Sequence, residues 1–312
     1  MKKLSFIVSL PTTDNDYQML QSASVEEAAR RLGVSIQVLS ADNDSVGQSQ
    51  QLLKIIQSKT EARPDGIIFE PAGGTALPQV ANAAAAAGIA WGVMNHDADY
   101  IPELRRAHHL PVFAITANHE EVGRIQGKQL GALLPKGGSV LLIEGPSQSM
   151  AAKQRTTGMY ETKPATVTVK HLKGQWTEES SYRAVHSWLR LSTSRQSSFD
   201  VVAAQDDSMA AGARKALLEL PDATARLRWS SIPYLGCDGV PDTGQAWVKQ
   251  GTLTATVVIP PTAGQALEIL VRAIQSSVMP PERTLTVPSS FPDLEVLAIR
   301  AEKFRTSSAV AR

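Results

Sequence analysis

Polar and aromatic side chains follow several short apolar stretches of this 312-residue sequence, at the points where those stretches end. The set combines carboxylates, amides, an imidazole, a guanidinium and two aromatic rings. Aromatic rings stack on C–H faces, and charged groups make the stronger hydrogen bonds to hydroxyls. The set therefore suits a sugar or another small polyol. Its members are Asn15, Tyr17, Asn95, His96, Ser149, Arg155, Trp176, Asp206 and Asp238.

The elements that would carry these side chains follow a regular pattern. Short β-branched stretches alternate with amphipathic stretches of about ten to sixteen residues, as in a parallel sheet with covering helices. The first block predicts strands at 4–10, 34–39, 65–69 and 89–94 and helices at 17–32, 47–58 and 76–87. The pattern then restarts, with strands predicted at 112–116, 139–143, 167–172, 201–204, 234–237, 253–258 and 294–299. The helices of this part are predicted at 120–134, 151–161, 178–191, 207–220 and 262–275.

Two successive blocks of this kind predict an α/β protein with two doubly wound parallel-sheet lobes. The carboxyl ends of parallel strands meet at one edge of a sheet, where ligands bind in such folds. We therefore expect the candidate residues at equivalent edges of the two sheets. The helix at 262–275 has nothing to pack on if the second lobe is already complete, which suggests that the chain crosses back to the first lobe.

Composition excludes several classes of protein. Lys and Arg number 31 and Asp and Glu 30, and no basic run is present, so we expect no nucleic-acid partner. The single cysteine, Cys237, excludes an internal disulfide and a cysteine-based zinc site. No stretch reaches the roughly 18 apolar residues that span a bilayer. Residues 1–3, Met-Lys-Lys, resemble the basic start of a secretory signal, but the apolar stretch 4–10 that follows is too short for one.

The sequence also lacks the motifs of common enzymes. The turn at 11–16 contains no glycine, so it does not match a dinucleotide fold, and no phosphate-binding loop or serine-nucleophile motif is present. His108, His109 and His119 have no metal-binding spacing, and we expect them on the solvated surface. The pair Asp206-Asp207 opens a helix, where capping explains at least one carboxylate. We therefore expect no enzyme activity, no cofactor and no metal.

Three stretches are the most specific in the chain: GPSQSMAAKQRTTG at 145–158, AAQDDSMAAG at 203–212 and LGCDG at 235–239. Residues 118–127 and 251–256 add weaker support. Through them the sequence resembles the ribose- and galactose-type periplasmic sugar-binding proteins, whose type I fold is shared with the ligand domains of lac-repressor-type regulators.

The resemblance implies a domain layout and a role for each candidate residue. It implies an N-terminal lobe of residues 1–116 and 260–288 and a C-terminal lobe of 117–259 and 289–312, joined by three hinge crossings near Thr116, Ile259 and Ser289. Asn15 and Tyr17 would bind and stack from the first lobe, and Arg155, Trp176, Asp206 and Asp238 would bind from the second. Ser149 lies in the most specific stretch. Ile259 stands where a polar hinge residue usually touches the ligand.

Two departures bear on the ligand. Asn95-His96 stands where an Asp-Arg pair commonly grips sugar hydroxyls, and Ile259 removes a hydrogen-bond partner. A ligand hydroxyl left unpaired against Ile259 would cost about 1–3 kcal/mol, roughly ten- to a hundredfold in affinity. The family's common aldose is therefore not expected, and a deoxy or less hydroxylated sugar, or a different polyol, fits better.

The resemblance implies a monomeric periplasmic solute-binding protein that captures a sugar or polyol in the cleft between its lobes. Its partners would be the membrane subunits of an ABC-type importer. The alternative is a ligand-sensing domain of a regulatory or chemosensory system, which could be cytoplasmic. A lac-repressor-type protein would carry a helix-turn-helix of about fifty residues before Leu4, which this sequence does not show, so we expect no DNA binding by that route.

Overall fold

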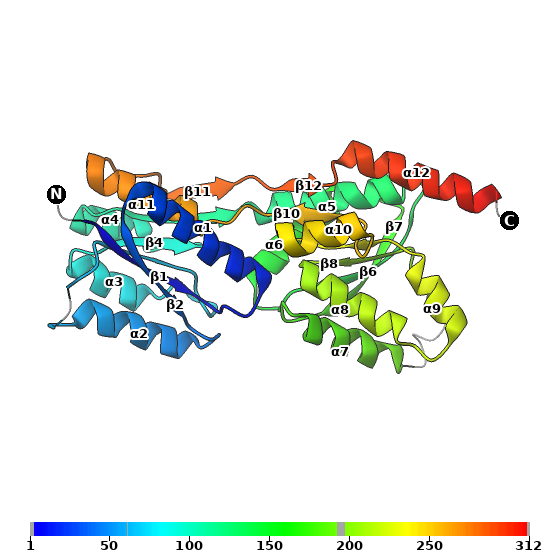
Figure 1. Cartoon of the computed structure of the whole chain (residues 1–312), viewed down its shortest axis with the longest axis horizontal. Coiled ribbons are helices and arrows are strands. Elements are labelled where there is room, and N and C mark those ends of the chain that lie inside the picture. Colours follow the sequence, from blue (N-terminus) through cyan, green and yellow to red (C-terminus); the bar gives the residue numbers. More distant parts are fainter. Residues whose placement is uncertain (1–2, 61, 192–196, 311–312) are drawn as a thin grey trace. The chain divides into compact units, whose positions relative to one another are not determined.

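The computed structural model describes residues 3–60, 62–191 and 197–310 (Figure 1). The chain forms two compact units. The first comprises Met1–Ala117 and Pro260–Thr286, and the second comprises Asn118–Ile259 and Val287–Arg312. Each unit contains a parallel sheet covered by helices on both faces.

The sheet of the first unit has six strands in the order β11-β5-β4-β3-β1-β2, and every neighbouring pair is parallel. The strand order reverses beside β1, so that β2 and β3 flank it. In open sheets of this kind, ligands bind at the carboxyl ends of the strands beside such a reversal. The strands are β1 (Ser5–Leu10), β2 (Ser35–Ser40), β3 (Gly66–Phe69), β4 (Ala90–Met94), β5 (Val112–Ala117) and β11 (Arg283–Thr286).

Alternation along the strands of the first unit supplies two hydrophobic cores. In β1, Phe6, Val8 and Leu10 face a core shared with α1 and α11, whereas Ile7 faces the opposite core shared with α2, α3 and α4. Successive side chains of a strand point to opposite faces, so a strand buried on both faces is apolar at nearly every position. The helices are α1 (Asp16–Leu32), α2 (Ser45–Gln57), α3 (Pro78–Ala86), α4 (Ile101–His108) and α11 (Ala263–Ser276).

The second unit repeats this architecture with the sheet order β7-β6-β8-β9. The antiparallel pair β10–β12 lies beside it, connected through the bridges Leu235–Ala255 and Asp238–Val258. The strands are β6 (Gly138–Glu144), β7 (Val167–Lys173), β8 (Val201–Ala204), β9 (Tyr234–Leu235), β10 (Thr256–Val258) and β12 (Ser289–Phe291).

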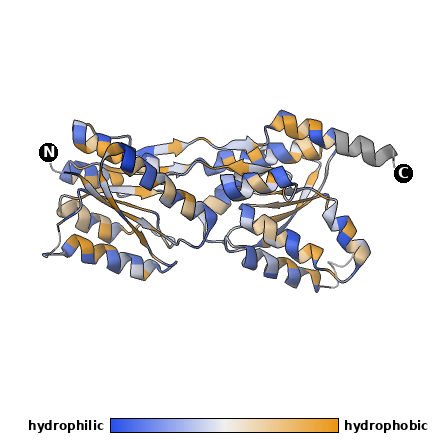
Figure 2. Cartoon of the chain, in the orientation of Figure 1, coloured by the Kyte–Doolittle hydropathy of each residue, from blue (hydrophilic) through white to orange (hydrophobic). Residues whose placement is uncertain are grey.

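The helices of the second unit divide between the two faces of its sheet. One core includes side chains of α7 to α10, and the other includes side chains of α5, α6 and α12. Most helices show both apolar and polar residues in Figure 2, as expected for helices that bury one side. They are α5 (His119–Leu133), α6 (Met150–Thr162), α7 (Glu178–Leu189), α8 (Asp207–Leu218), α9 (Ala223–Ser230), α10 (Ala246–Gln250) and α12 (Leu294–Val310). A π-helical turn, Pro241–Gln245, precedes α10.

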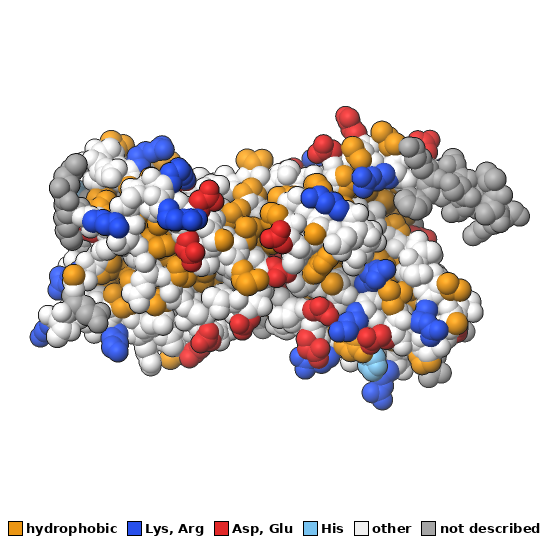
Figure 3. Space-filling view, in the orientation of Figure 1, with side chains coloured by type: hydrophobic (Ala, Val, Ile, Leu, Met, Phe, Trp, Pro, Cys, Tyr) orange, Lys and Arg blue, Asp and Glu red, His pale blue; other side chains and the backbone are white. Residues whose placement is uncertain are grey.

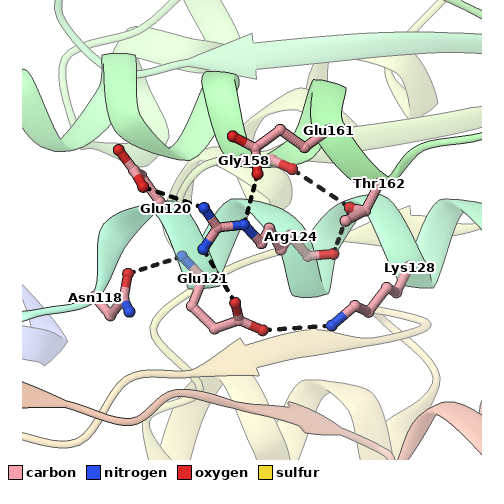
Figure 4. Close-up of polar contacts among 8 residues, drawn as sticks. All are labelled: Asn118, Glu120, Glu121, Arg124, Lys128, Gly158, Glu161 and Thr162. Atoms are coloured by element: carbon pink, nitrogen blue, oxygen red, sulfur yellow. Dashed lines mark hydrogen bonds and ion pairs between the residues drawn. The ribbon is translucent and has the colours of Figure 1, made fainter.

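Glycines allow α5 and α6 to approach closely. A Cβ atom added at Gly123 would lie 2.0 Å from the carbonyl oxygen of Arg155, and one at Gly158 would lie 1.9 Å from that of Glu120. Outside this contact, Arg124 on α5 bonds through Nε to Glu161 on α6 at 2.6 Å (Figure 4). The backbone contact fixes the position of α6, the helix that carries Arg155.

The structure corrects the prediction of a strand at 294–299. These residues begin α12, in which Leu297 and Ala301 are buried four residues apart while Val296 and Ile299 are exposed. The apolar residues therefore follow the helical period, and the amide of Leu297 donates to the carbonyl of Asp293 in the first turn. The strands predicted at 234–237 and 253–258 are real but shorter.

Surface composition matches the near-neutral charge of the sequence. On the face drawn in Figure 3, basic and acidic side chains lie interspersed among the described residues. No helix in the described part of the chain is both long and apolar enough to cross a membrane.

Candidate functional site

The structure places the predicted site residues in segments that follow strands, in two sets, with Arg155 inside the helix α6. Four lie in the first unit, after β1 and β4: Asn15, Tyr17, Asn95 and His96. Six lie in the second unit, after β6, β7, β8, β9 and β10: Ser149, Arg155, Trp176, Asp206, Asp238 and Ile259.

Asn15 and Tyr17 stand at the start of α1. The Asn15 Oδ1 atom accepts a hydrogen bond from the amide of Gln18 at 2.8 Å, which caps the helix. The half-buried Tyr17 donates its hydroxyl to the carbonyl of Pro260 at 3.4 Å. Both side chains therefore have a structural contact as well as a position at the sheet edge.

Asn95 is paired with Glu70, a residue that the sequence interpretation missed. Asn95 lies just after β4 with a φ of +52°, in the left-handed region, and its Nδ2 donates to Glu70 Oε2 at 3.0 Å. A carboxylate only accepts hydrogen bonds, so this contact fixes the orientation of the Asn95 amide. Glu70 comes directly after β3, and the same reasoning that selected Asn95 after β4 could have found it. His96, the next residue, is half-buried.

Arg155 is the centre of the set in the second unit. Its side chain is 8% exposed, and one terminal nitrogen donates to the carbonyl of Gln205 and lies 3.7 Å from Asp238 Oδ1. Its guanidinium carbon is 5.4 Å from the centre of the Trp176 ring, a cation–π contact. Its Nε atom is buried and has no hydrogen-bond partner among the described residues. The structure thus brings Arg155, Trp176 and Asp238 together around a donor that a ligand oxygen could pair.

Trp176 is held between Arg155 and the backbone of the strand end. An added Cβ at Gly145 would lie 2.2 Å from two atoms of the Trp176 six-membered ring, so only glycine fits there. Trp176 has a φ of +61° and packs against the core that contains α7 and α8. Its ring is therefore fixed in place before any ligand arrives.

Two predicted residues of this unit also cap helices. Ser149 Oγ accepts from the amide of Ala152 at 3.2 Å, at the start of α6, and Asp206 Oδ1 accepts from the amide of Met209, at the start of α8. Capping by Asp206 agrees with the sequence interpretation of the Asp206-Asp207 pair.

Ile259 is a core residue in this structure, with a side chain 1% exposed. Its amide donates to the carbonyl of Asp238 at 2.9 Å, so it supports the backbone of a site residue.

Sequence reasoning also missed the roles of Gln205 and Asp207. The fully buried Gln205 follows β8 directly; its Oε1 accepts from the amide of Gly145 at 2.9 Å, and its Nε2 donates to Thr156 Oγ1 at 2.9 Å. Asp207 is buried beside it, and burial together with the nearby charge of Asp238 raises the pKa of its carboxyl well above the usual range. These residues form the support beneath Arg155 and Asp238.

The histidines and the cysteine do not form a second site. In the described residues, no group of three or more His, Cys, Asp or Glu side chains could hold a metal ion. His108 and His109 are exposed, but the expectation of a surface position is wrong for His119, which begins α5 and is buried. Cys237 is buried, and this burial raises the pKa of its thiol well above the usual range. A raised pKa disfavours the thiolate, which is the reactive form of cysteine.

Comparison with known proteins decides the family. The family model for the periplasmic binding protein domain matches residues 6–277. The chain belongs to this family. The resemblance to ribose- and galactose-type sugar-binding proteins is thereby confirmed, as is the prediction that the protein is not an enzyme, because the members bind substrates without transforming them.

Individual relatives extend the match. The chain is 28% identical over 219 residues to a candidate rhizopine-binding protein of Rhizobium meliloti. The match covers 67% of this chain and 66% of that relative, so the chain spans just under two thirds of the relative's length. It is 22% identical over 278 residues to the D-allose-binding periplasmic protein of Escherichia coli, covering 88% and 86% of the two chains. A solved solute-binding protein of an Actinobacillus succinogenes ABC transporter, with bound D-allose, has the same fold. Its TM-score is 0.78 at 21% identity, with 95% of this chain and 99% of that chain covered.

Proposed function

We propose that this protein captures a sugar or related small polyol for an ABC-type importer. The observation that carries the proposal is the group formed by Arg155, Trp176 and Asp238. It offers a buried guanidinium, a fixed aromatic ring and a carboxylate at one sheet edge. A polyol hydroxyl can donate to the carboxylate and accept from the guanidinium, while the C–H face of a ring compound packs on the indole.

The first unit contributes the complementary set of Asn15, Tyr17, Glu70, Asn95 and His96 in this proposal. Four of these side chains carry hydroxyl, amide or imidazole groups that can donate and accept, and Glu70 can only accept. In this proposal the two units close around the ligand by hinge rotation, and a ligand bonded to both sets holds them closed, as in other two-lobed binding proteins. Small-angle scattering should then give a smaller radius of gyration with the bound compound than without it.

Relatives guide the choice of compounds to test. The curated relative of Escherichia coli is named for D-allose, and the Actinobacillus protein contains D-allose. In this chain, Asn95-His96 and Ile259 differ from the pattern that its resemblance led us to expect, so the compound panel must be wider than aldoses. We propose a periplasmic location and ABC-transporter membrane subunits as partners on the same family grounds.

A thermal-shift screen tests the proposal. The full chain is heated with D-allose, D-ribose, L-arabinose, 2-deoxy-D-glucose and myo-inositol, each at millimolar concentration. A compound present at a hundred times its Kd stabilises the folded state by about 2.7 kcal/mol, which is a shift of several degrees. A rise with at least one compound in the wild type, lost in Asp238→Ala, supports the proposal. If none raises the midpoint while an amino acid or a purine base does, the sugar assignment is wrong.

A further inference from the structure

The loop that carries Asp238 is folded around a second carboxylate, that of Asp207. Asp207 is the first residue of α8 and is 4% exposed. Its Oδ2 accepts from the amide of Gly239 at 2.8 Å, and its Oδ1 accepts from the hydroxyl of the buried Thr256 at 2.6 Å. One side chain thus connects α8, the Asp238 loop and β10.

Two glycines of the loop enclose this carboxylate. An added Cβ at Gly236 would lie 2.1 Å from Asp207 Oδ1, and one at Gly244 would lie 2.0 Å from Asp207 Oδ2. Any larger residue at either position would displace the carboxylate or the loop. The segment 236–244 therefore has the shape that the Asp207 side chain imposes.

The bond from Asp207 acts on the peptide group next to Asp238. Asp238 and Gly239 have φ values of +97° and +58°, and the first is unusual for a residue with a side chain. The peptide group between them is held at both ends: its N–H donates to Asp207, and its carbonyl accepts from the amide of Ile259 at 2.9 Å. The preceding amide, that of Asp238, donates to the carbonyl of Val257 at 2.9 Å. With its backbone held in this way, Asp238 directs its carboxylate toward Arg155.

We infer that Asp207 is the positioning residue of the ligand site: it holds the unusual backbone of Asp238 so that the Asp238 carboxylate faces Arg155. The inference rests on the proposed function, because Asp238 matters to a ligand only if the Arg155 group binds one. Asp207 itself, enclosed by Gly236, Gly244, Gly239 and Thr256, does not touch the ligand.

Asp200 provides a matched control in the same unit. Its Oδ2 accepts from the amide of Ser139 at 2.7 Å and from the Ser139 hydroxyl at 2.9 Å, the same pair of donor types that Asp207 has. It precedes β8, whereas Asp207 follows that strand, so it lies at the opposite edge of the sheet. Removal of Asp200, which is exposed, deletes bonds from the same two donor types at the other edge of the sheet from Asp238.

The experiment compares Asp207→Ala, Asp207→Asn and Asp200→Ala in the full chain by amide hydrogen exchange. Asp207→Ala should speed exchange at Gly239 and Asp238 at least tenfold. Asp207→Asn should largely restore protection, because its side-chain oxygen can still accept from Gly239. Asp200→Ala should speed exchange at Ser139 and leave Gly239 unchanged. Should Asp207→Ala not fold, Thr256→Val, which removes one of the two bonds to the carboxylate, should still speed exchange at Gly239.

The second readout is binding of D-allose, D-ribose and myo-inositol by calorimetry. Any of these that binds the wild type should bind Asp207→Ala on the order of tenfold more weakly, and Asp207→Asn and Asp200→Ala within about threefold of the wild type. Unchanged exchange at Gly239 in Asp207→Ala and Thr256→Val, or unchanged affinity in a folded Asp207→Ala, overturns the inference. If no probe binds the wild type, the proposed function fails, and exchange at Gly239 still decides whether Asp207 positions Asp238.

Discussion

Replacement of Arg155 by alanine should destabilise the protein and weaken ligand binding together. The Arg155 guanidinium donates to the carbonyl of Gln205, lies 3.7 Å from Asp238 and stacks on Trp176. Arg155→Ala removes a cation that lies 3.7 Å from the carboxylate of Asp238, whose side chain is only 19% exposed. A merely structural arginine on the surface would not have these consequences.

The magnitude follows from the contacts that are lost. A hydrogen bond from a charged donor contributes about 1.5–3 kcal/mol, and a partly buried cation–π contact adds about 1 kcal/mol. Removal of the buried Nε, which has no partner among the described residues, returns about 1–2 kcal/mol. The net expectation for Arg155→Ala is a loss of about 2 kcal/mol in the free energy of unfolding.

Urea denaturation at pH 7 measures this loss, and Arg124→Ala is the matched control. Arg124 bonds to three glutamates on the surface of α5 and α6 (Figure 4). Such exposed ion pairs contribute about 0–1 kcal/mol each to the free energy of unfolding. The double variant Arg155→Ala/Asp238→Ala should lose less than the sum of its two single variants, because each single variant already removes the contact between Arg155 and Asp238. A loss below 0.5 kcal/mol in Arg155→Ala, or additive effects in the double variant, would refute the reasoning.

Three further predictions concern the elements that hold this group. Gly158→Ala should lower the free energy of unfolding by about 2 kcal/mol or more in thermal denaturation, since its Cβ would meet a backbone carbonyl. The control Gly131→Ala in α5, whose Cβ would have its nearest atom 3.7 Å away, should raise that free energy by up to about 1 kcal/mol, and equal effects of the two variants would contradict the close helix contact. Trp176→Ala should weaken binding of any panel compound that binds the wild type by about 1–3 kcal/mol in calorimetry. It should also lower the free energy of unfolding, because the ring packs on Gly145 and the core; a change in stability without a change in affinity would show that the ring serves packing only. Burial raises the pKa of Asp207 above its unfolded value of about 3.9, so its contribution to stability is present below that pH and is lost as the pH rises through the folded pKa. In urea denaturation, the stability of Asp207→Asn relative to the wild type should therefore increase as the pH rises above about 4. A difference independent of pH would count against a raised pKa for this buried carboxyl.

The alternation of strands and helices could be predicted because local periodicity reports burial. β3 contains only glycine and apolar residues, and β1 is apolar except at Ser5 and Ser9, since both faces of the sheet are covered. α1 shows the helical spacing of a surface helix. The same signal failed at 294–299, where six residues of mixed polarity fit a strand or the first turns of a helix. The burial of Leu297 and Ala301 against α5 and its neighbours decides between them, and this is tertiary information.

The candidate site was predictable as far as position along the chain reveals it. Residues after strand ends could be found, and Arg155, Trp176 and Asp238 do meet in the structure. The partners that hold them could not be found in this way. Asp207 was predicted only as one of the pair Asp206-Asp207, of which helix capping explains at least one member. Its bonds to Gly239 and Thr256 join segments more than thirty residues apart. Such pairings depend on the order of the strands in the sheet, which periodicity does not encode.

Calorimetric titration of the full chain with the pentoses, hexoses, deoxysugars and inositols of the panel tests the central claim most directly. We expect that at least one compound binds with one molecule per chain, that chelation of metal ions leaves its affinity unchanged, and that Asp238→Ala weakens its binding by about 1–3 kcal/mol. Binding of an amino acid or a purine base, with no heat from any sugar or polyol, would contradict it.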